Sequence, residues 1–584
     1  MLYLNNKQTS IESLNSQPIF KSIKIINEKK ISTLQIVIDS DKGLWGFGER
    51  FDNLNQKGLV RENKVFEKFT NQGDKTYLPI PFFLSNDFGI YIDTFEVFNI
   101  YSTIKKDKNI ISIPSDLNQR DIYIFIGTPK EQLKAFLSLK GDVVVPPIWS
   151  FGPWMSANRW NNQELVLEMA RKSKALGFFH TVIVVEAWSD EATFYSFNDK
   201  SLWPNPKEMI KELKNLGLHL ILWQVPVLKK LNNNEHNQLH EKDCEYAINN
   251  NLVVKKSDGS VYTIPKDRWF EESMIPDFTN PETKKWWFNK RQYLLDMGVD
   301  GFKTDGGEFI YDDDIIFFDG STGKEMRNKY PLSYTQAYYE ALGKDKVLFS
   351  RSGYTSSWQT PIHWAGDQMS TFKELKHQLI AGLNASVSGI FFWSFDIAGF
   401  AGEMPSKELY LRAFSLGTFS PIMQWHSEPL GGQFSKIMKS KDAINDRSPW
   451  NIAKIYNDDN ILEITKSFTT LREKIIPYLY EEALYSKDNC VALMKPLFYS
   501  HPKDKNVFDI EDEFYLGRSL LVAPIVNENQ VERSIYIPEG NWFDCQLKIK
   551  IEGKSYIQRK YSLAEIGLFI NLDTNYSKLK NILI

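Results

Sequence analysis

Residues 280–305 read NPETKKWWFNKRQYLLDMGVDGFKTD, which contains one complete helix-then-strand unit. Asn280 is typical of a helix N-cap and Pro281 of the first helical position, so a helix is predicted over residues 281–297. The short apolar segment Val299–Asp305 then predicts a buried strand that ends in a carboxylate. Similar units recur along the chain, and their repetition decides the fold.

Short apolar segments alternate with amphipathic helical segments between residues 146 and 483, and eight strands are predicted there. Their bounds are Ile148–Trp154, Thr181–Trp188, Leu218–Pro226, Val299–Asp305, Val347–Ser352, Ile362–Asp367, Gly389–Ile397 and Pro421–His426. Eight βα repeats predict an α/β protein built on a (β/α)8 TIM barrel. An open doubly wound sheet is the alternative, but it more often shows a glycine-rich phosphate turn after its first strand, and none is evident.

Strand-forming segments dominate the chain on both sides of the predicted barrel. We therefore predict an N-terminal β-sandwich over residues 1–145, the barrel over 146–483 and a C-terminal β-sandwich over 484–584. Within the barrel, residues 227–280 form a polar stretch that is too long for an ordinary loop. This stretch is predicted to be an insertion over the barrel mouth.

Composition excludes several classes of protein. The 70 Lys and Arg residues nearly balance the 73 Asp and Glu residues, so no net field attracts nucleic acid or an anionic membrane. No apolar stretch approaches the ~18 residues that span a bilayer, and the N-terminus lacks a signal-peptide pattern. Cys244, Cys490 and Cys545 are odd in number and far apart, which favours a reducing compartment. We expect a cytoplasmic protein without nucleic-acid or membrane partners. The sequence does not decide whether the protein forms a homo-oligomer.

Polar residues mark the ends of the predicted strands, where TIM barrels carry their reactive groups. These residues are Glu186, Lys303, Asp305, Arg351, Asp367, Asp396 and His426. Two carboxylates on different strands, supported by cations and tryptophans, are the parts needed to cleave a glycosidic bond. Such chemistry requires no metal and no cofactor, and the eight scattered histidines predict no metal site.

Asp305 and Asp367 suit opposite roles in that chemistry. Lys303 lies on the same strand face as Asp305, where a cation favours the ionised carboxylate. Trp364 and Ala365 place an apolar wall near Asp367, which raises its pKa and keeps it protonated. Each residue also has a structural alternative: a buried Lys–Asp ion pair for Asp305 and, for Asp367, an N-cap of the helix that begins near residue 370.

Several motifs resemble, in the right order, glycoside hydrolase family 31, a family of retaining α-glycosidases. Residues 298–308 resemble the nucleophile segment of the family, and residues 351–353 followed by 363–367 resemble its arginine and acid/base segment. Further similarities lie at residues 46–50, 146–149, 392–400, 426, 514–517 and 538–542. The resemblance runs from about residue 40 to about residue 545.

The resemblance implies roles for the strand-end residues. Asp305 becomes the nucleophile and Asp367 the acid/base, while Asp396 orients Arg351. The substrate contacts it implies are Glu186, Lys303, Arg351, Trp364, Phe400 and His426. Of the four tryptophans at or beyond strand ends, Trp154, Trp160, Trp188 and Trp223, at least two are expected in the core, and we assign Trp223 to the substrate.

Two departures from the family pattern concern the sugar. Lys303 stands where many α-glucosidases of the family have Trp. In having Lys at this position, the chain is more similar to the α-xylosidase branch. Glu186 is the nearest match to an Asp that binds the 4-hydroxyl. We predict a retaining exo-acting α-glycosidase that hydrolyses terminal α-linked glucose or xylose from oligosaccharides by double displacement. Alternatives are an α-galactosidase, another α-glycosidase or transglycosylase of the same family, and a catalytically silent carbohydrate-binding protein.

Overall fold

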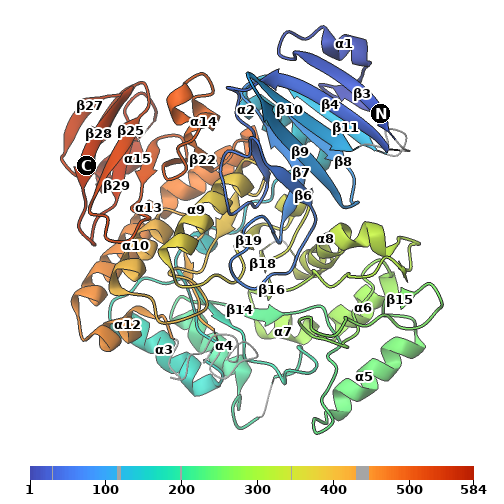
Figure 1. Cartoon of the computed structure of the whole chain (residues 1–584). Helices are drawn as coiled ribbons and strands as arrows, with labels where there is room; N and C mark the ends of the chain where they lie inside the picture. Colours follow the sequence, from blue (N-terminus) through green and yellow to red (C-terminus); the bar gives the residue numbers. More distant parts are fainter. Residues whose placement is uncertain are drawn as a thin grey trace.

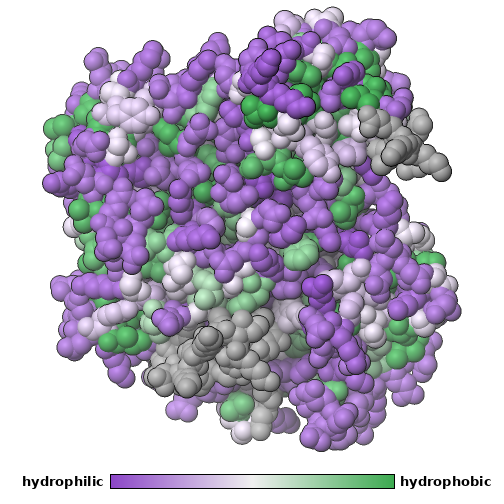
Figure 2. All heavy atoms as spheres, viewed as in Figure 1, coloured by the Kyte–Doolittle hydropathy of each residue, from purple (hydrophilic) through white to green (hydrophobic). Residues whose placement is uncertain are grey.

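A computed structural model describes residues 1–28, 31–114, 120–158, 160–197, 200–343, 345–428, 446–575 and 577–583. Figure 1 shows a barrel with two β-rich domains side by side above it. The two domains touch where the rings of Trp45 and Phe498 stack, with centroids 3.8 Å apart. Figure 2 shows hydrophilic groups over most of the same face, with small hydrophobic patches between them. No helix in the described ranges combines the length and the apolar character needed to cross a membrane.

Eight parallel strands form the barrel, which confirms the predicted fold class. The strands are β12 (Trp154–Ser156), β13 (Val182–Val185), β14 (His219–Gln224), β16 (Gly301–Thr304), β18 (Val347–Ser350), β19 (Ile362–Trp364), β20 (Phe392–Ser394) and β21 (Gln424–Trp425). The last strand, β21, pairs in parallel with β12. A parallel bridge between Asp396 and Gln424 joins the ends of β20 and β21, so the ring closes.

The predicted first strand, Ile148–Trp154, is wrong in its bounds. Its first part is the 3-10 turn η1 (Ile148–Phe151), in which Ser150 N donates to Pro147 O at 2.9 Å. Pro153 has no N–H to donate to a neighbouring strand, so regular pairing starts only at Trp154. The strand β12 therefore begins where the prediction ends.

Helices cover the outside of the barrel (Figure 1). They are α3 (Gln163–Ala175), α4 (Pro206–Asn215), α6 (Pro281–Asn289), α7 (Gln292–Met297), α8 (Gly323–Leu342), α9 (Phe372–Ser386), α10 (Lys407–Thr418), α12 (Pro449–Tyr456) and α13 (Asn460–Asn489), with the short turn η2 (Ser357–Gln359). The predicted N-cap Asn280 accepts a hydrogen bond from Glu282 N. The helix predicted over 281–297 is broken at Arg291, whose backbone N–H donates to Phe288 O at 2.9 Å instead of to Trp287 O; the Arg291 side chain donates to Trp287 O at 2.9 Å.

The segment between β14 and α6 carries elements of its own. It contains α5 (Gln238–Asn249) and β15 (Lys255–Lys256), which pairs antiparallel with β17 (Ile315–Ile316) in the loop after β16. This pairing joins the segment to the strand end that bears Asp305. Trp269, in the same segment, reaches the barrel mouth, where its ring centre lies 4.8 Å from the Arg351 guanidinium carbon.

Two sheets form the N-terminal domain, in the orders β2-β1-β11-β8-β7-β5 and β3-β4-β10-β9-β6. The elements are β1 (Leu2–Leu4), β2 (Lys7–Gln8), α1 (Ile11–Asn15), β3 (Ser22–Glu28), β4 (Ile31–Asp39), β5 (Trp45–Gly48), β6 (Val60–Asn63), β7 (Pro79–Leu84), β8 (Phe88–Asp93), β9 (Phe98–Lys105), β10 (Lys108–Pro114), β11 (Asp121–Ile126) and α2 (Pro129–Lys140). An apolar cluster of Leu, Ile and Phe side chains from both sheets fills the space between them.

The C-terminal domain has a six-stranded sheet, β22-β23-β24-β29-β26-β27, and the separate pair β25-β28. The elements are β22 (Met494–Pro496), α14 (Leu497–Ser500), η3 (Lys505–Val507), β23 (Phe514–Leu516), β24 (Leu520–Ala523), β25 (Glu532–Ile537), β26 (Asn541–Asp544), β27 (Ile549–Glu552), β28 (Ser555–Lys560), β29 (Gly567–Asn571) and α15 (Ser577–Leu583). The barrel is thus flanked by a β-rich domain at each end of the chain, as predicted.

Two asparagines on barrel helices hold the N-terminal domain in place. Asn384 on α9 accepts from Gly46 N at 3.3 Å and donates to Asn53 O at 2.9 Å. Asn328 on α8 accepts from Val65 N at 2.8 Å. The second contact fixes the start of residues 64–77, a segment of the N-terminal domain that we call the N-loop. Because both asparagines are buried, the N-loop has a defined position over the barrel.

Glu49, which follows β5, is buried in this interface. Its Oε1 accepts from Trp393 Nε1 at 2.8 Å, and its Oε2 has no hydrogen-bond partner among the described residues. Burial raises the pKa of Glu49 to about 8, although the Trp393 hydrogen bond opposes the shift. The folded protein therefore keeps a proton that the unfolded chain releases near pH 4.5. Consequently, the free energy of unfolding falls as pH rises from about 4.5 to about 8.

Glu49→Gln is accordingly expected to stabilise the protein at pH 8, by on the order of 4 kcal/mol, and to have little effect near pH 4.5. Thermal unfolding of both proteins across this pH range measures the difference. Glu528→Gln, at an exposed position, is the matched control and should leave the pH dependence unchanged. A lower melting temperature of Glu49→Gln at pH 8 would contradict the prediction.

Candidate active site

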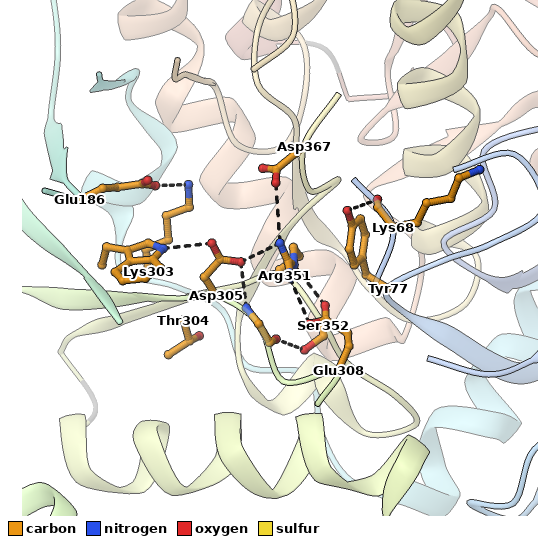
Figure 3. A network of polar contacts seen from close by, with 12 residues as sticks. Lys68, Tyr77, Glu186, Lys303, Thr304, Asp305, Glu308, Arg351, Ser352 and Asp367 are labelled. Carbon is orange, nitrogen blue, oxygen red and sulfur yellow. Dashed lines mark hydrogen bonds and ion pairs between the residues drawn. The ribbon is translucent and has the colours of Figure 1, made fainter. Parts of the chain in front are cut away.

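Arg351, directly after β18, lies at the centre of the barrel mouth and contacts three carboxylates (Figure 3). Its Nη1 is 3.1 Å from Asp305 Oδ1 and 3.7 Å from Asp367 Oδ2. On its other edge, Nε donates to Glu308 Oε1 at 3.1 Å and Nη2 to Glu308 Oε2 at 3.0 Å. One buried guanidinium thus joins the two carboxylates singled out in the sequence.

Two aromatic rings hold the Arg351 guanidinium from outside the barrel strands. Its carbon lies 4.7 Å from the ring centre of Tyr77, in the N-loop, and 4.8 Å from that of Trp269. The Tyr77 ring also packs on Gly366, where a Cβ would approach the ring to 2.3 Å. Gly366 has a φ of +70°, so both space and backbone geometry require glycine beside Asp367.

Asp305 follows β16 and accepts two further hydrogen bonds. Trp223 Nε1 donates to its Oδ2 at 3.0 Å, and Gly306 N donates to its Oδ1 at 2.8 Å. Together with Arg351, these donors stabilise a negative charge on Asp305. Lys303 forms its direct ion pair with Glu186, and the charge of Asp305 also contributes to the raised pKa of Lys303, so Lys303 acts on Asp305 without direct contact.

Asp367 lies beyond β19 in a buried environment. Burial raises the pKa of Asp367 well above its ordinary value; Arg351 opposes the shift and the charge of Asp305 adds to it. The raised pKa favours the protonated form of this carboxyl group, which is the form that a general acid needs. Asp367 does not cap α9, because the N-cap of that helix is Thr371, whose side chain accepts from Glu374 N.

Glu186, on the other side of Asp305 from Arg351 in Figure 3, contacts two nitrogen-bearing side chains, Lys303 and His426. Its Oε1 lies 2.5 Å from Lys303 Nζ and 2.9 Å from His426 Nε2. Burial raises the pKa of Glu186, but His426 and Lys303 outweigh burial and lower it to about 2. Glu186 is therefore ionised, and we call these three residues the Glu186 cluster.

Aromatic rings border the Glu186 cluster. The Lys303 ammonium lies 4.5 Å from the ring centre of Trp364. The rings of Phe400 and His426 stack with centroids 5.1 Å apart. Phe400 also packs against Phe69 of the N-loop. Predicted substrate residues from five strands and the loops after them are therefore gathered in one place.

The expectation that Asp396 orients Arg351 is wrong. Asp396 Oδ1 accepts from Gln424 Nε2 at 2.5 Å, and its Oδ2 has no hydrogen-bond partner in the described part of the chain. The strand order explains the difference, because Asp396 follows β20, which is two places from β18. Glu308 follows β16, the direct neighbour of β18, and it makes the paired contact with Arg351.

Family models match three consecutive parts of the chain. The glycosyl hydrolase family 31 N-terminal galactose mutarotase-like domain matches residues 8–97, its TIM-barrel domain residues 143–482 and its C-terminal domain residues 491–574. The chain belongs to glycoside hydrolase family 31. The resemblance inferred from the motifs is thereby confirmed.

Relatives in family 31 include both hydrolases and transferases. The isomaltosyltransferase of Sporosarcina globispora is 35% identical over 90% of this chain, which covers 50% of that protein. The 1,3-α-isomaltosidase of Kribbella flavida is 35% identical over 87% of this chain, which covers 72% of it. The cycloalternan-forming enzyme of Listeria monocytogenes, solved in complex with a pentasaccharide substrate, is a structural neighbour with a TM-score of 0.88 and 32% sequence identity. The alignment covers 94% of this chain and 55% of that enzyme. The chain spans about half the length of the first and third of these relatives.

Three of the four tryptophans at the strand ends of this family 31 barrel lie in the core, which agrees with the expectation of at least two. Trp154, Trp160 and Trp188 are fully buried, and their ring N–H groups donate to Ser150 O, Asp446 Oδ2 and Trp223 O. Trp223 is partly exposed and donates to Asp305. Among the described residues, no group of three or more His, Cys, Asp and Glu side chains is arranged to hold a metal ion.

Proposed function

We propose that this chain is a retaining α-glycosidase that acts on α-linked gluco-oligosaccharides, with Asp305 as the nucleophile and Asp367 as the acid/base. The observation that carries the proposal is the contact of both carboxylates with one Arg351 nitrogen. Two oxygens at those distances from one atom are at most about 7 Å apart, and closer whenever the angle at the nitrogen is below 180°, which is compatible with the ~5–5.5 Å typical of retaining enzymes.

The reaction proceeds by double displacement. Asp367 donates its proton to the leaving oxygen while an Asp305 oxygen attacks the anomeric carbon. The glycosyl–Asp305 ester then reacts with water or with a sugar hydroxyl, and Asp367 accepts the proton of that nucleophile. Hydrolysis and transfer differ only in the group that attacks in the second step. Both activities for which the relatives are named, hydrolysis and glycosyl transfer, are therefore compatible with this site.

Arg351 supports both halves of the cycle. When the ester forms, Asp305 loses its negative charge and Asp367 becomes ionised. Because Arg351 contacts both carboxylates, a cation lies beside whichever of them is charged. The buried Glu308 pair and the Tyr77 and Trp269 rings fix the guanidinium in advance, so little reorganisation is needed during the reaction.

The Glu186 cluster supplies the contacts for the sugar that forms the ester. Its ionised carboxylate accepts hydrogen bonds from hydroxyl groups, and Lys303 and His426 donate to hydroxyl oxygens. Glucose is favoured over xylose because two relatives, an isomaltosyltransferase and a 1,3-α-isomaltosidase, are named for a sugar unit built of glucose. A cytoplasmic location is supported by the three cysteines, all of which are free.

Glu186→Ala is expected to lower kcat/KM on α-glucosides by at least about 100-fold, because the site loses the group that pairs with Lys303 and His426 and binds hydroxyls. The test measures release of glucose, isomaltose and xylose from isomaltotriose, an aryl α-glucoside and an aryl α-xyloside. Glu208→Ala, at an exposed position of α4, is the control. Faster turnover of the xyloside would contradict the glucose assignment, and no turnover of any substrate would contradict the glycosidase proposal.

A further inference from the structure

A network of buried side chains runs from the outer helices of the barrel to Asp305. It begins at Arg291, at the break between α6 and α7. The Arg291 guanidinium is buried against the Trp287 ring, with its carbon 3.8 Å from the ring centre. Its Nε donates at 2.6 Å to Oε1 of Gln224, the last residue of β14. The break in the helix therefore brings a cation to the strand beside β16, which Asp305 follows.

Arg291 is a buried cation without a carboxylate partner. Among the described residues, no Asp or Glu forms an ion pair with it, and its Nη2 makes no hydrogen bond. Burial lowers the pKa of Arg291, as is usual for a cation held away from water. An apolar side chain would fill the same space at a lower cost in desolvation. A guanidinium at this position therefore indicates a use for the hydrogen bonds that it donates.

Arg291 decides which end of the Gln224 amide faces Trp223. Arg291 Nε and the Tyr338 hydroxyl both donate to Gln224 Oε1, at 2.6 Å and 2.9 Å. The Tyr338 hydroxyl accepts from Trp287 Nε1 at 2.8 Å, so its own proton is available to Gln224. A reversed amide would place its NH2 group against these donors. Gln224 Oε1 therefore faces the helices, and Gln224 Nε2 faces the strand ends.

Gln224 Nε2 holds Trp223 from two sides. It donates at 2.9 Å to Trp223 O and at 2.7 Å to Phe194 O. The Phe194 ring packs edge-on against the Trp223 ring, with centroids 5.6 Å apart. Both the backbone and the ring of Trp223 are thereby fixed. Trp223 Nε1 donates to Asp305 Oδ2, whereas Arg351 pairs with Asp305 Oδ1, so the orientation of the second carboxylate oxygen depends on Trp223.

Gln224 also holds the main chain of Asp305. Asp305 N donates to Gln224 O at 2.9 Å. The Tyr334 hydroxyl, from α8, lies 3.2 Å from Asp305 O and 3.4 Å from Gln224 O. A shift of Gln224 would therefore move the main chain of Asp305 together with the ring that donates to its carboxylate.

We propose that Arg291 is a positioning residue for the nucleophilic carboxylate of Asp305. It acts through Gln224, whose amide it orients, and through Trp223, whose ring N–H donates to the carboxylate. This inference rests on the proposed function. Arg291 and Gln224 are buried, so they act through Trp223 and not by contact with the sugar. A displaced carboxylate slows the chemical step, whereas the Glu186 cluster still binds the sugar. The expected signature is a lower kcat with a nearly unchanged KM.

Arg291→Ala removes the guanidinium and leaves space for one from solution. We expect kcat to fall about 20-fold on isomaltotriose and on nitrophenyl α-glucoside, the value of one lost hydrogen bond to a charged group. KM should change by about threefold at most. Guanidinium added at millimolar concentration should restore most of the lost kcat and leave the wild type unchanged. Arg171→Ala, at an exposed position of α3, is the control and should neither lose activity nor respond to guanidinium.

Gln224→Glu is the second variant, because glutamate keeps the shape of the side chain and pairs with Arg291, so the protein should fold. A carboxylate cannot donate to the carbonyls of Trp223 and Phe194, so kcat should fall at least as far as in Arg291→Ala. Guanidinium should not restore this loss. Fluorine NMR of protein labelled with fluorotryptophan reports on Trp223 directly. Its signal, identified by its absence in Trp223→Phe, should move in both variants.

Three results would overturn the positioning role and leave the proposed function standing. The first is a wild type that cleaves both substrates together with folded variants whose kcat lies within about twofold of it. The second is a Trp223 signal that stays in place in both variants, which would assign any loss of kcat to a general loss of structure. The third is a loss in Arg291→Ala that guanidinium leaves unchanged. A wild type that cleaves neither substrate overturns both proposals.

Discussion

Asp305→Ala is expected to lower kcat on every α-glucoside by at least about 10⁴-fold, since no ester can form without this carboxylate. The loss should be as large for an activated aryl leaving group as for a sugar. Steady-state rates on dinitrophenyl α-glucoside and isomaltotriose measure it. Asp296→Ala removes an exposed carboxylate of α7 and should keep wild-type rates.

Azide separates a nucleophile from any other essential carboxylate. Alanine at position 305 leaves space on the face of the sugar from which the carboxylate attacks, so azide added to Asp305→Ala should enter there in a single displacement. The product from an α-glucoside is then the β-glucosyl azide, which NMR identifies by its anomeric coupling. Residual activity above about 1% that azide does not change would be inconsistent with a nucleophilic Asp305.

The barrel could be predicted from sequence because its signals are local. Buried parallel strands are short apolar runs, and helix starts such as Asn280-Pro281 are recognised within one turn. One error, in the first strand, was local and came from Pro153, whereas the break of helix 281–297 involves a distant partner. At the break, Arg291 N pairs with Phe288 O, while the Arg291 side chain donates to Trp287 O and, at 2.6 Å, to Gln224 Oε1 on β14.

The site could be predicted only as far as strand ends determine it. Strand ends in a TIM barrel meet at one face, and this rule was enough to bring Glu186, Arg351 and Asp367 together. Which cation pairs with which carboxylate was not predictable, because it depends on distances across the barrel. Lys303 is two residues from Asp305, yet it pairs with Glu186, 117 positions earlier in the chain.

Three residues of the site were missed for different reasons. Glu308 was part of a quoted motif, and its position three residues after Asp305 on the strand next to Arg351 was the available signal. Tyr77 and Trp269 lie outside the barrel strands, and no spacing relates them to position 351. Their contacts exist because Asn328 and the β15–β17 pairing hold their segments over the mouth, which only the folded structure reveals.

Asp367→Ala is expected to have an effect that depends on the leaving group. Isomaltotriose needs a proton on its leaving oxygen, so kcat/KM should fall by about 10³-fold or more. Dinitrophenolate departs without a proton, so formation of the ester from the dinitrophenyl glucoside should be nearly as fast as in the wild type. The ester then accumulates, because water lacks its general base, and a burst of dinitrophenol should precede a slow steady state. Asp142→Ala, at an exposed position, is the control and should show no burst.

Azide and pH give two further readouts for Asp367. Azide needs no general base and attacks the ester from the side that the leaving group vacated, so Asp367→Ala should yield the α-glucosyl azide, opposite to the product of Asp305→Ala. The raised pKa of Asp367 means that the wild type loses activity as pH rises and the acid ionises, which gives kcat/KM its basic limb. Alanine cannot ionise, so this limb should be absent in the variant. A β-glucosyl azide, or a basic limb that persists on isomaltotriose, would assign the proton transfer to another group.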